Sequence, residues 1–167
     1  MPVPDPASAQ SGVLVAHDPR ELRGEHLPDS EALTANGPAG GNIWDNGGAL
    51  RRVTAKSAVG GYYDNVGDAS CLAGRFNHWC GTITALWVTT VEAGSGITIY
   101  NGRCASYLSQ EGDSGGAVWG PQYDGTAAAQ GLHRGTFDGI CPGPLPKLYT
   151  HIGFALSALG LWDIIYG

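Results

Sequence analysis

The sequence is short of positive charge and of long apolar runs. Nine lysines and arginines stand against fifteen aspartates and glutamates, which gives a net charge of -6, and only Arg51 and Arg52 are adjacent cations. Nucleic acid is not expected as a partner, because affinity for it depends on clustered cations that neutralise phosphates. No run approaches the roughly 20 apolar residues that span a bilayer, so a membrane is not expected either.

The cysteines include no Cys-x-x-Cys pair. Because structural zinc sites usually draw their ligands from such pairs, no metal is expected, and no other motif indicates a cofactor. The four cysteines form an even set, which favours disulfides with three possible connectivities. Pairing of Cys71 with Cys80 and of Cys104 with Cys141 is preferred, since each pair falls within one strand-loop-strand segment. Disulfides indicate an oxidising compartment, yet the first twelve residues have no signal-peptide pattern.

The content of glycine and proline predicts an all-β fold. The 167 residues include 27 glycines and 10 prolines, which break short apolar runs into strand-sized pieces. Residues 35–49, rich in asparagine and glycine, are expected to form a loop. A C-terminal helix is predicted after Thr150 as N-cap, with Gly160 as the stop. Strands are predicted at 13–16, 50–54, 69–72, 82–90, 97–100, 116–119, 127–132 and 147–149.

The stretch QEGDSGGAVW at 110–119 carries a candidate nucleophile. A serine hydroxyl needs a base to take its proton and N–H groups to hold the oxyanion, and flanking glycines allow the tight turn that exposes it. Ser114 is the candidate nucleophile, and the N–H groups of Gly112 and Ser114 are the candidate oxyanion hole. Asp113 is expected to be buried and to need a cation. The alternative is a glycine-rich turn with an incidental serine.

Four segments in the same order resemble the secreted bacterial chymotrypsin-like serine proteases, the streptogrisin and α-lytic protease group. They are CLAGRFNHWCGTITAL at 71–86, NGRCASYLSQEGDSGGAVW at 101–119, AAAQGLHRG at 127–135 and YTHIGFALSALGL at 149–161. The resemblance implies a chymotrypsin-like antiparallel β-barrel fold with a C-terminal α-helix and a Ser-His-Asp triad between two barrels. It also implies an extracellular protein with peptide or protein substrates, and it supports the two preferred disulfides.

The resemblance also divides the chain and assigns further residues. Residues 1–12, rich in proline and alanine, are expected to be a tail or linker. The resemblance implies that 13–49 are a remnant of the first barrel with the inter-barrel loop and that 50–167 are a complete second barrel, so an N-terminally shortened chain with only a partial first barrel is expected. Asp29, within LPDSEALTA, is the candidate catalytic carboxylate. The candidate substrate-binding residues are Leu132, His133, Arg134 and Gly135.

Two departures from the relatives concern the nucleophile loop and the substrate strand. Leu72 stands where the relatives have the arginine that meets the buried aspartate, and Arg75 is close enough in sequence to substitute for it. Arg134, Gly135 and Thr136 stand where the relatives have Ser-Gly-Gly.

A convincing catalytic base is missing. His17 and His26 lack the Ala-x-His-Cys pattern of the family, His78 and His151 lie elsewhere by the resemblance, and His133 is expected to shape the substrate pocket.

The preferred function is a serine endopeptidase with weak or no activity in this chain. The competing function is a non-catalytic module that adds a peptide strand to an exposed edge at Ala127 to Arg134. An esterase with the same nucleophile has no sequence feature in its favour. The sequence does not determine which substrate side chain is preferred before the cleaved bond, the natural substrate or the oligomeric state.

Overall fold

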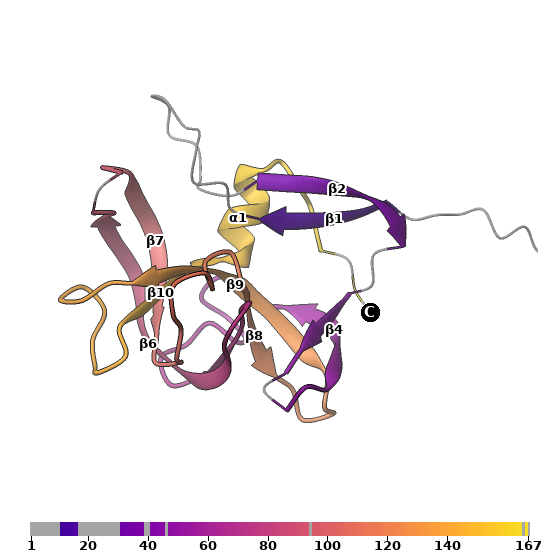
Figure 1. Cartoon of the computed structure of the whole chain (residues 1–167), viewed down its shortest axis with the longest axis horizontal. Coiled ribbons are helices and arrows are strands. Elements are labelled where there is room, and N and C mark those ends of the chain that lie inside the picture. Colours follow the sequence, from indigo (N-terminus) through magenta and orange to yellow (C-terminus); the bar gives the residue numbers. More distant parts are fainter. Residues whose placement is uncertain are drawn as a thin grey trace, which may run out of the picture.

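The chain forms a closed barrel of six antiparallel strands (Figure 1). The computed structural model describes residues 11–16, 31–38, 41–45, 47–93, 95–164 and 166, the first two ranges as backbone. The barrel strands follow the order β10-β7-β6-β5-β8-β9, and pairing of β10 with β9 closes the ring. Their bounds are β5 Ala69–Ala73, β6 His78–Val91, β7 Thr98–Ala105, β8 Ala117–Pro121, β9 Ala127–Thr136 and β10 Lys147–His151. The prediction of an all-β barrel is confirmed.

Two strands before the barrel extend its sheet. The strand β4, Leu50–Lys56, runs parallel to the start of β9, with Val53 opposite Ala127, and β3, Asn42–Trp44, pairs with β4. The predicted loop over 35–49 is therefore wrong. The turn between β3 and β4 is confined to a few residues, because the Asp45 carboxylate accepts hydrogen bonds from the N–H groups of Gly47 and Ala49.

A separate two-stranded sheet precedes these strands. The strand β1, Ser11–Ala16, pairs with β2, Glu31–Pro38, in antiparallel register, so that Val13 lies opposite Thr34. The predicted strand at 13–16 is confirmed, and β2 occupies the start of the segment that was expected to be a loop.

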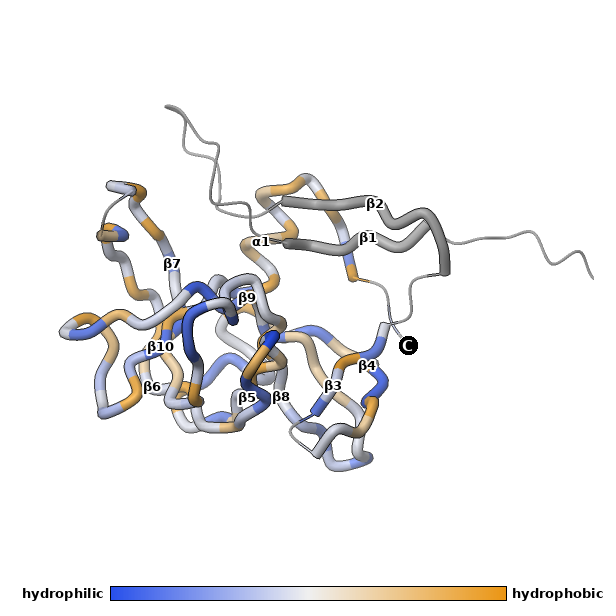
Figure 2. The backbone as a smooth tube through the Cα atoms, in the orientation of Figure 1, coloured by the Kyte–Doolittle hydropathy of each residue, from blue (hydrophilic) through white to orange (hydrophobic). Residues whose placement is uncertain are grey.

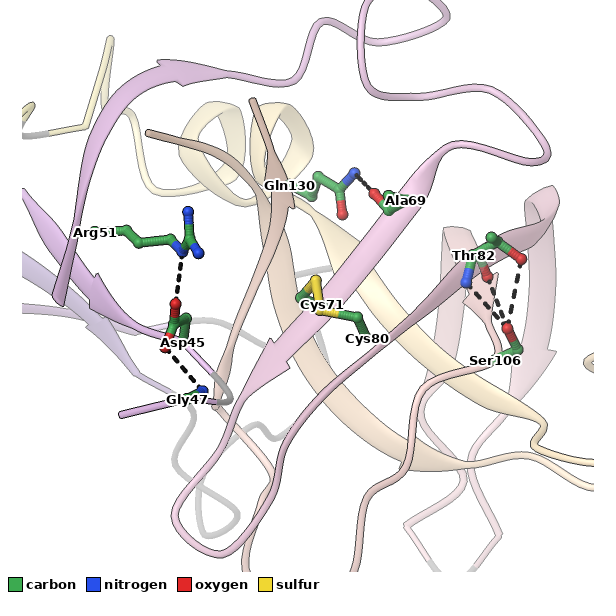
Figure 3. The surroundings of a disulfide bond; sticks show 9 residues. All are labelled: Asp45, Gly47, Arg51, Ala69, Cys71, Cys80, Thr82, Ser106 and Gln130. Carbon is green, nitrogen blue, oxygen red and sulfur yellow. Dashed lines mark hydrogen bonds and ion pairs between the residues drawn. A yellow bond between two sulfur atoms is a disulfide. The ribbon is translucent and has the colours of Figure 1, made fainter. Parts of the chain in front are cut away.

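Two disulfides join neighbouring parts of the barrel. Cys71 of β5 bonds to Cys80, its register partner on β6, and Figure 3 shows this bond between the two strands. Cys104 of β7 bonds to Cys141 in the loop before β10. Both predicted pairings are confirmed. The barrel packs around them, and Figure 2 shows hydrophobic and hydrophilic residues mixed along its strands, as expected where one face of each strand is buried.

A buried ion pair lies between the barrel and the C-terminal helix. Nε and Nη2 of Arg103 each donate a hydrogen bond of 2.7 Å to the carboxylate of Asp64, and both side chains are fully buried. The guanidinium also lies over the rings of Trp87 and Phe154, at 4.3 and 5.5 Å from their centroids. Burial alone would raise the pKa of Asp64, but the hydrogen bond from Arg103 and that from Gly60 outweigh burial and lower it.

The helix α1, Ile152–Ala158, covers one end of the barrel. Its N-cap is His151 and not the predicted Thr150, because Nδ1 of His151 accepts the N–H of Gly153 at 3.0 Å. Thr150 instead stays in β10, opposite Leu132 of β9. The predicted helix itself is confirmed. Among the described residues, no helix is long and apolar enough to cross a membrane.

Candidate active site

Ser114 is exposed on a tight loop between β7 and β8. Gly112 and Gly115 on either side have positive φ angles of 92° and 79°, which favour glycine. The loop folds back on itself, since Asp113 donates its N–H to Gln110. It is held against β9, because the N–H of Gly115 bonds to the carbonyl of His133 at 2.8 Å. The sequence thus presents the serine on a loop fixed by backbone contacts.

The buried carboxylate of Asp113 anchors the nucleophile loop through hydrogen bonds. It is 1% exposed and accepts hydrogen bonds from the side-chain amide of Asn77 at 2.6 Å and from the N–H groups of Phe76 and Gln110 at 2.7 and 3.0 Å. Burial alone would raise the pKa of Asp113, but these hydrogen bonds outweigh burial and lower it. The carboxylate is therefore satisfied by neutral donors.

The prediction that Arg75 meets Asp113 is wrong. Arg75 is exposed and lies over the ring of Phe76, with its guanidinium carbon 4.9 Å from the ring centroid. Asn77, two residues further on, makes the contact that was assigned to a cation. Sequence reasoning missed Asn77 because it assumed that a buried carboxylate requires a positive charge, whereas three or more N–H donors also stabilise the ionised form.

The hydroxyl of Ser114 faces the β9 strand. It donates a hydrogen bond of 2.9 Å to the carbonyl of Arg134. Arg134 is the extra residue of a β-bulge, because Gly135 pairs with Leu148 of β10 and His133 pairs with Tyr149. In the part of the chain that the structure describes, the N–H groups of Gly112 and Ser114 donate to no protein acceptor. Both are thus free to hold a substrate oxygen.

The free edge of β9 near Ser114 is short. The strand pairs with β8 from Ala127 to Leu132, and on its other side with β4 and then with β10. An exposed edge running from Ala127 to Arg134 is therefore wrong. On the Ser114 side, 134–136 pair with no described strand. The N–H of Phe137 donates to the carbonyl of Pro146, on the β10 side of the strand. Because the backbone groups of successive strand residues point to opposite sides, the N–H and C=O of Thr136 point to the open side near Ser114.

The candidate substrate-binding residues on β9 differ in exposure. Leu132 and His133 are buried, at 9% and 1% exposure, and Gly135 is half-buried. The guanidinium of Arg134 forms an ion pair with Glu92 at 3.1 Å, and burial lowers the pKa of Arg134 to about 10. Both the carbonyl and the side chain of Arg134 thus have protein partners, while Gly135 presents backbone alone.

None of the three described histidines forms a hydrogen bond with Ser114. His78 opens β6, and the ring of His133 is buried with Nδ1 3.1 Å from the hydroxyl of Tyr107. His151 is fully buried, with Nε2 2.9 Å from the hydroxyl of Ser57. Burial is the main cause that lowers the pKa of His133 and of His151 to about 4, so both rings are neutral at pH 7. The sequence candidates His17, His26 and Asp29 lie outside the described residues.

Comparisons with known proteins agree with this geometry. No protein-family model matches the sequence, and no curated protein matches it. Among solved structures, Cellulomonas bogoriensis chymotrypsin is 26% identical, with a TM-score of 0.63, over 81% of this chain and 68% of its own. Thermobifida fusca protease A is 23% identical, with a TM-score of 0.65, over 86% of this chain and 73% of its own.

A third similar structure is a glutamic-acid-specific serine protease that uses a histidine triad in substrate binding. It is 26% identical, with a TM-score of 0.60, over 77% of this chain and 63% of its own, so this chain spans less than two thirds of its length. The chain therefore has the fold of the bacterial chymotrypsin-like serine proteases, as the sequence resemblance implied.

Proposed function

We propose that this chain is a serine endopeptidase that cleaves peptide bonds through an acyl-enzyme at Ser114. The observation that carries the proposal is the position of Ser114, exposed on an anchored loop beside the free edge of β9. In the reaction the Ser114 oxygen attacks the scissile carbonyl carbon, and its proton passes to a base and then to the leaving amine. Water next cleaves the acyl-enzyme and restores the hydroxyl.

The backbone around Ser114 supplies two further parts of this chemistry. The N–H groups of Gly112 and Ser114, which have no acceptor among the described residues, stabilise the negative oxygen of the tetrahedral intermediate. The open edge at 134–136 pairs with the substrate backbone as an added strand, with the N–H and C=O of Thr136 as its partners. Peptides and proteins are the substrates that such an edge holds in register.

The general base of this proposal is not one of the described histidines. Both ring contacts of His151 are with protein groups, and the buried ring of His133 bonds to Tyr107. The base is then His17, His26 or a histidine supplied from outside this sequence, with Asp29 as the candidate for the carboxylate that orients it. We expect hydrolysis by this chain alone to be weak, because no described base contacts Ser114.

The family resemblance also supports a location and a division of the chain. Two disulfides suit an oxidising compartment, which favours an extracellular protein. Residues 50–167 are proposed as the second barrel, and 13–49 as the remnant of the first barrel with the inter-barrel loop.

A fluorophosphonate probe tests the proposal, because the probe bonds covalently only to an activated serine hydroxyl. We expect the folded chain to be labelled at Ser114, as located by mass spectrometry of the digested protein, and the Ser114→Ala variant to stay unlabelled. The matched control is Ser57→Ala, which removes a buried hydroxyl away from the loop and should leave labelling unchanged. A folded chain that stays unlabelled shows that neither His17 nor His26 activates Ser114, and it contradicts hydrolysis by this chain alone.

A further inference from the structure

A buried lysine lies at the start of β10, opposite Thr136 at the end of β9. Lys147, the first residue of β10, is 6% exposed, and its ammonium donates a hydrogen bond of 2.7 Å to the hydroxyl of Thr136 on β9. An ammonium has three N–H donors, so one neutral hydroxyl leaves two of them for other acceptors. A buried cation with a neutral partner is costly unless an anion reaches it.

No described carboxylate neutralises this lysine. Among the described residues, no acidic group lies within 4.0 Å of the Lys147 ammonium. Burial is the main cause that lowers the pKa of Lys147, and Asp138 raises it only from a longer range. The charge therefore stays available for an acidic group that enters from outside.

The bulge in β9 places this lysine on the same face as His133. Lys147 pairs with Thr136 and Tyr149 pairs with His133, and residues two apart on β10 share a face of the strand. Exposure falls along this face, because Thr136 is exposed, Lys147 is 6% exposed and His133 is 1% exposed. The positive charge of Lys147 also helps to lower the pKa of His133, after burial, which agrees with their proximity. On this face the Lys147 ammonium therefore lies between the exposed Thr136 and the buried His133.

One extended side chain of a substrate can span the gap between Ser114 and the Lys147 ammonium. Thr136 lies two residues beyond Arg134, whose carbonyl accepts the Ser114 hydroxyl. Two strand residues span about 7 Å, and a glutamate side chain bridges most of that distance from its own backbone. A residue whose carbonyl meets Ser114 can therefore extend its side chain to the ammonium.

We infer that Lys147 and Thr136 form the binding site for an acidic side chain, glutamate before aspartate, on the residue whose carbonyl Ser114 attacks. This inference rests on the proposed endopeptidase function for its place in the reaction. The cation of this site is a lysine; of the three described histidines, His133 lies on the same face, whereas His151 contacts Ser57 and His78 opens β6. The carboxylate accepts N–H groups of Lys147 and the hydroxyl of Thr136.

Peptide binding to the full chain carrying Ser114→Ala tests this inference without requiring hydrolysis. Fluorescein-labelled Ala-Ala-Ala-Glu, Ala-Ala-Ala-Gln and Ala-Ala-Ala-Lys amides are titrated and followed by fluorescence anisotropy. Because a hydrogen bond between charged groups strengthens binding, we expect the glutamate peptide to bind about tenfold to a hundredfold more tightly than the glutamine peptide. Adding Lys147→Met should abolish the preference, and adding Lys147→Glu should make the lysine peptide bind best. Lys56→Met, at an ammonium bound to Trp162 and Asp163, is the control that keeps the preference.

The possible results separate this inference from the proposed function. Equal binding of glutamate and glutamine peptides to the chain with Lys147 intact overturns the inference, even if both Lys147 variants fail to fold. A glutamate preference that survives Lys147→Met also overturns it. Fluorophosphonate labelling of Ser114 without a glutamate preference removes the inference alone. A glutamate preference that depends on Lys147, in a folded chain that stays unlabelled, supports the binding site and removes the endopeptidase function.

Discussion

Asn77 is expected to hold the nucleophile loop in place through Asp113. The Asn77→Ala substitution removes the 2.6 Å hydrogen bond to the carboxylate of Asp113, a residue that is 1% exposed. The main donors left to this carboxylate are the backbone N–H groups of Phe76 and Gln110. A hydrogen bond to a charged group contributes about 1.5–3 kcal/mol, so the free energy of unfolding should fall by about 2 kcal/mol. Urea unfolding followed by tryptophan fluorescence measures this change.

The same substitution should slow the chemistry at Ser114. Asp113 lies between the two proposed oxyanion donors, so a loosened carboxylate lets both N–H groups drift from the positions that hold the oxygen. We expect fluorophosphonate labelling of Ser114 to slow by about tenfold or more in Asn77→Ala, a loss on the scale of one misplaced oxyanion donor.

The matched control is Arg75→Ala, at the residue that the sequence pointed to. Arg75 is exposed and contacts the ring of Phe76, so its loss should change the free energy of unfolding by about 0.5 kcal/mol or less and leave labelling unchanged. The reasoning is refuted if Arg75→Ala destabilises the chain more than Asn77→Ala does, because the carboxylate would then depend on the cation.

Three further predictions concern the barrel. Arg103→Met should cost about 3–5 kcal/mol in urea unfolding, because it leaves the Asp64 carboxylate buried without its partner, and adding Asp64→Asn should recover part of the loss. Replacing both cysteines of the Cys104–Cys141 bond, 37 residues apart, should cost about 4 kcal/mol, against about 2.5 kcal/mol for the Cys71–Cys80 bond, 9 apart; equal losses would contradict the loop-entropy argument. His133 and His151 have folded pKa values of about 4, below their unfolded value near 6.5, so the unfolded state binds more protons in that window. Stability should then fall from about pH 6.5 to pH 4 by up to about 3 kcal/mol for each histidine, and a urea midpoint that stays constant over this range would contradict the neutral burial of both rings.

The strands of the barrel could be predicted from the sequence because their signals are local, whereas their closure into a barrel was implied by the family resemblance. Short apolar runs between turn residues gave the strands β5 to β10, and the cysteine spacing gave both disulfides. The nucleophile loop was equally local, since its glycines adopt the positive φ angles that a tight turn requires.

The features that sequence reasoning missed depend on partners far along the chain. The contact between Asn77 and Asp113 joins residues 36 apart, and the parallel pairing of β4 with β9 joins Val53 to Ala127. No local pattern encodes either contact. The N-cap was placed one residue early because serine, threonine, aspartate and asparagine are the usual caps, whereas here a histidine ring nitrogen accepts the N–H.

One other group of side chains contains the residue types of a catalytic triad without its geometry. The ring of His151 lies 2.9 Å from the Ser57 hydroxyl and 3.8 Å from the Asp64 carboxylate. Because Nδ1 of His151 accepts the N–H of Gly153, the neutral ring carries its proton on Nε2, the nitrogen that faces both Ser57 and Asp64. That nitrogen donates to the Ser57 oxygen and has no lone pair to take its proton, and a triad needs the carboxylate at the opposite nitrogen.

The hydroxyl of Ser57 is also occupied. It donates to the carbonyl of Tyr63 at 3.0 Å, and Ser57 is only 2% exposed, so a substrate cannot reach it. The exposed Ser114, whose hydroxyl meets the open edge of β9, therefore stays the candidate nucleophile, and the base that it needs must come from outside this buried group.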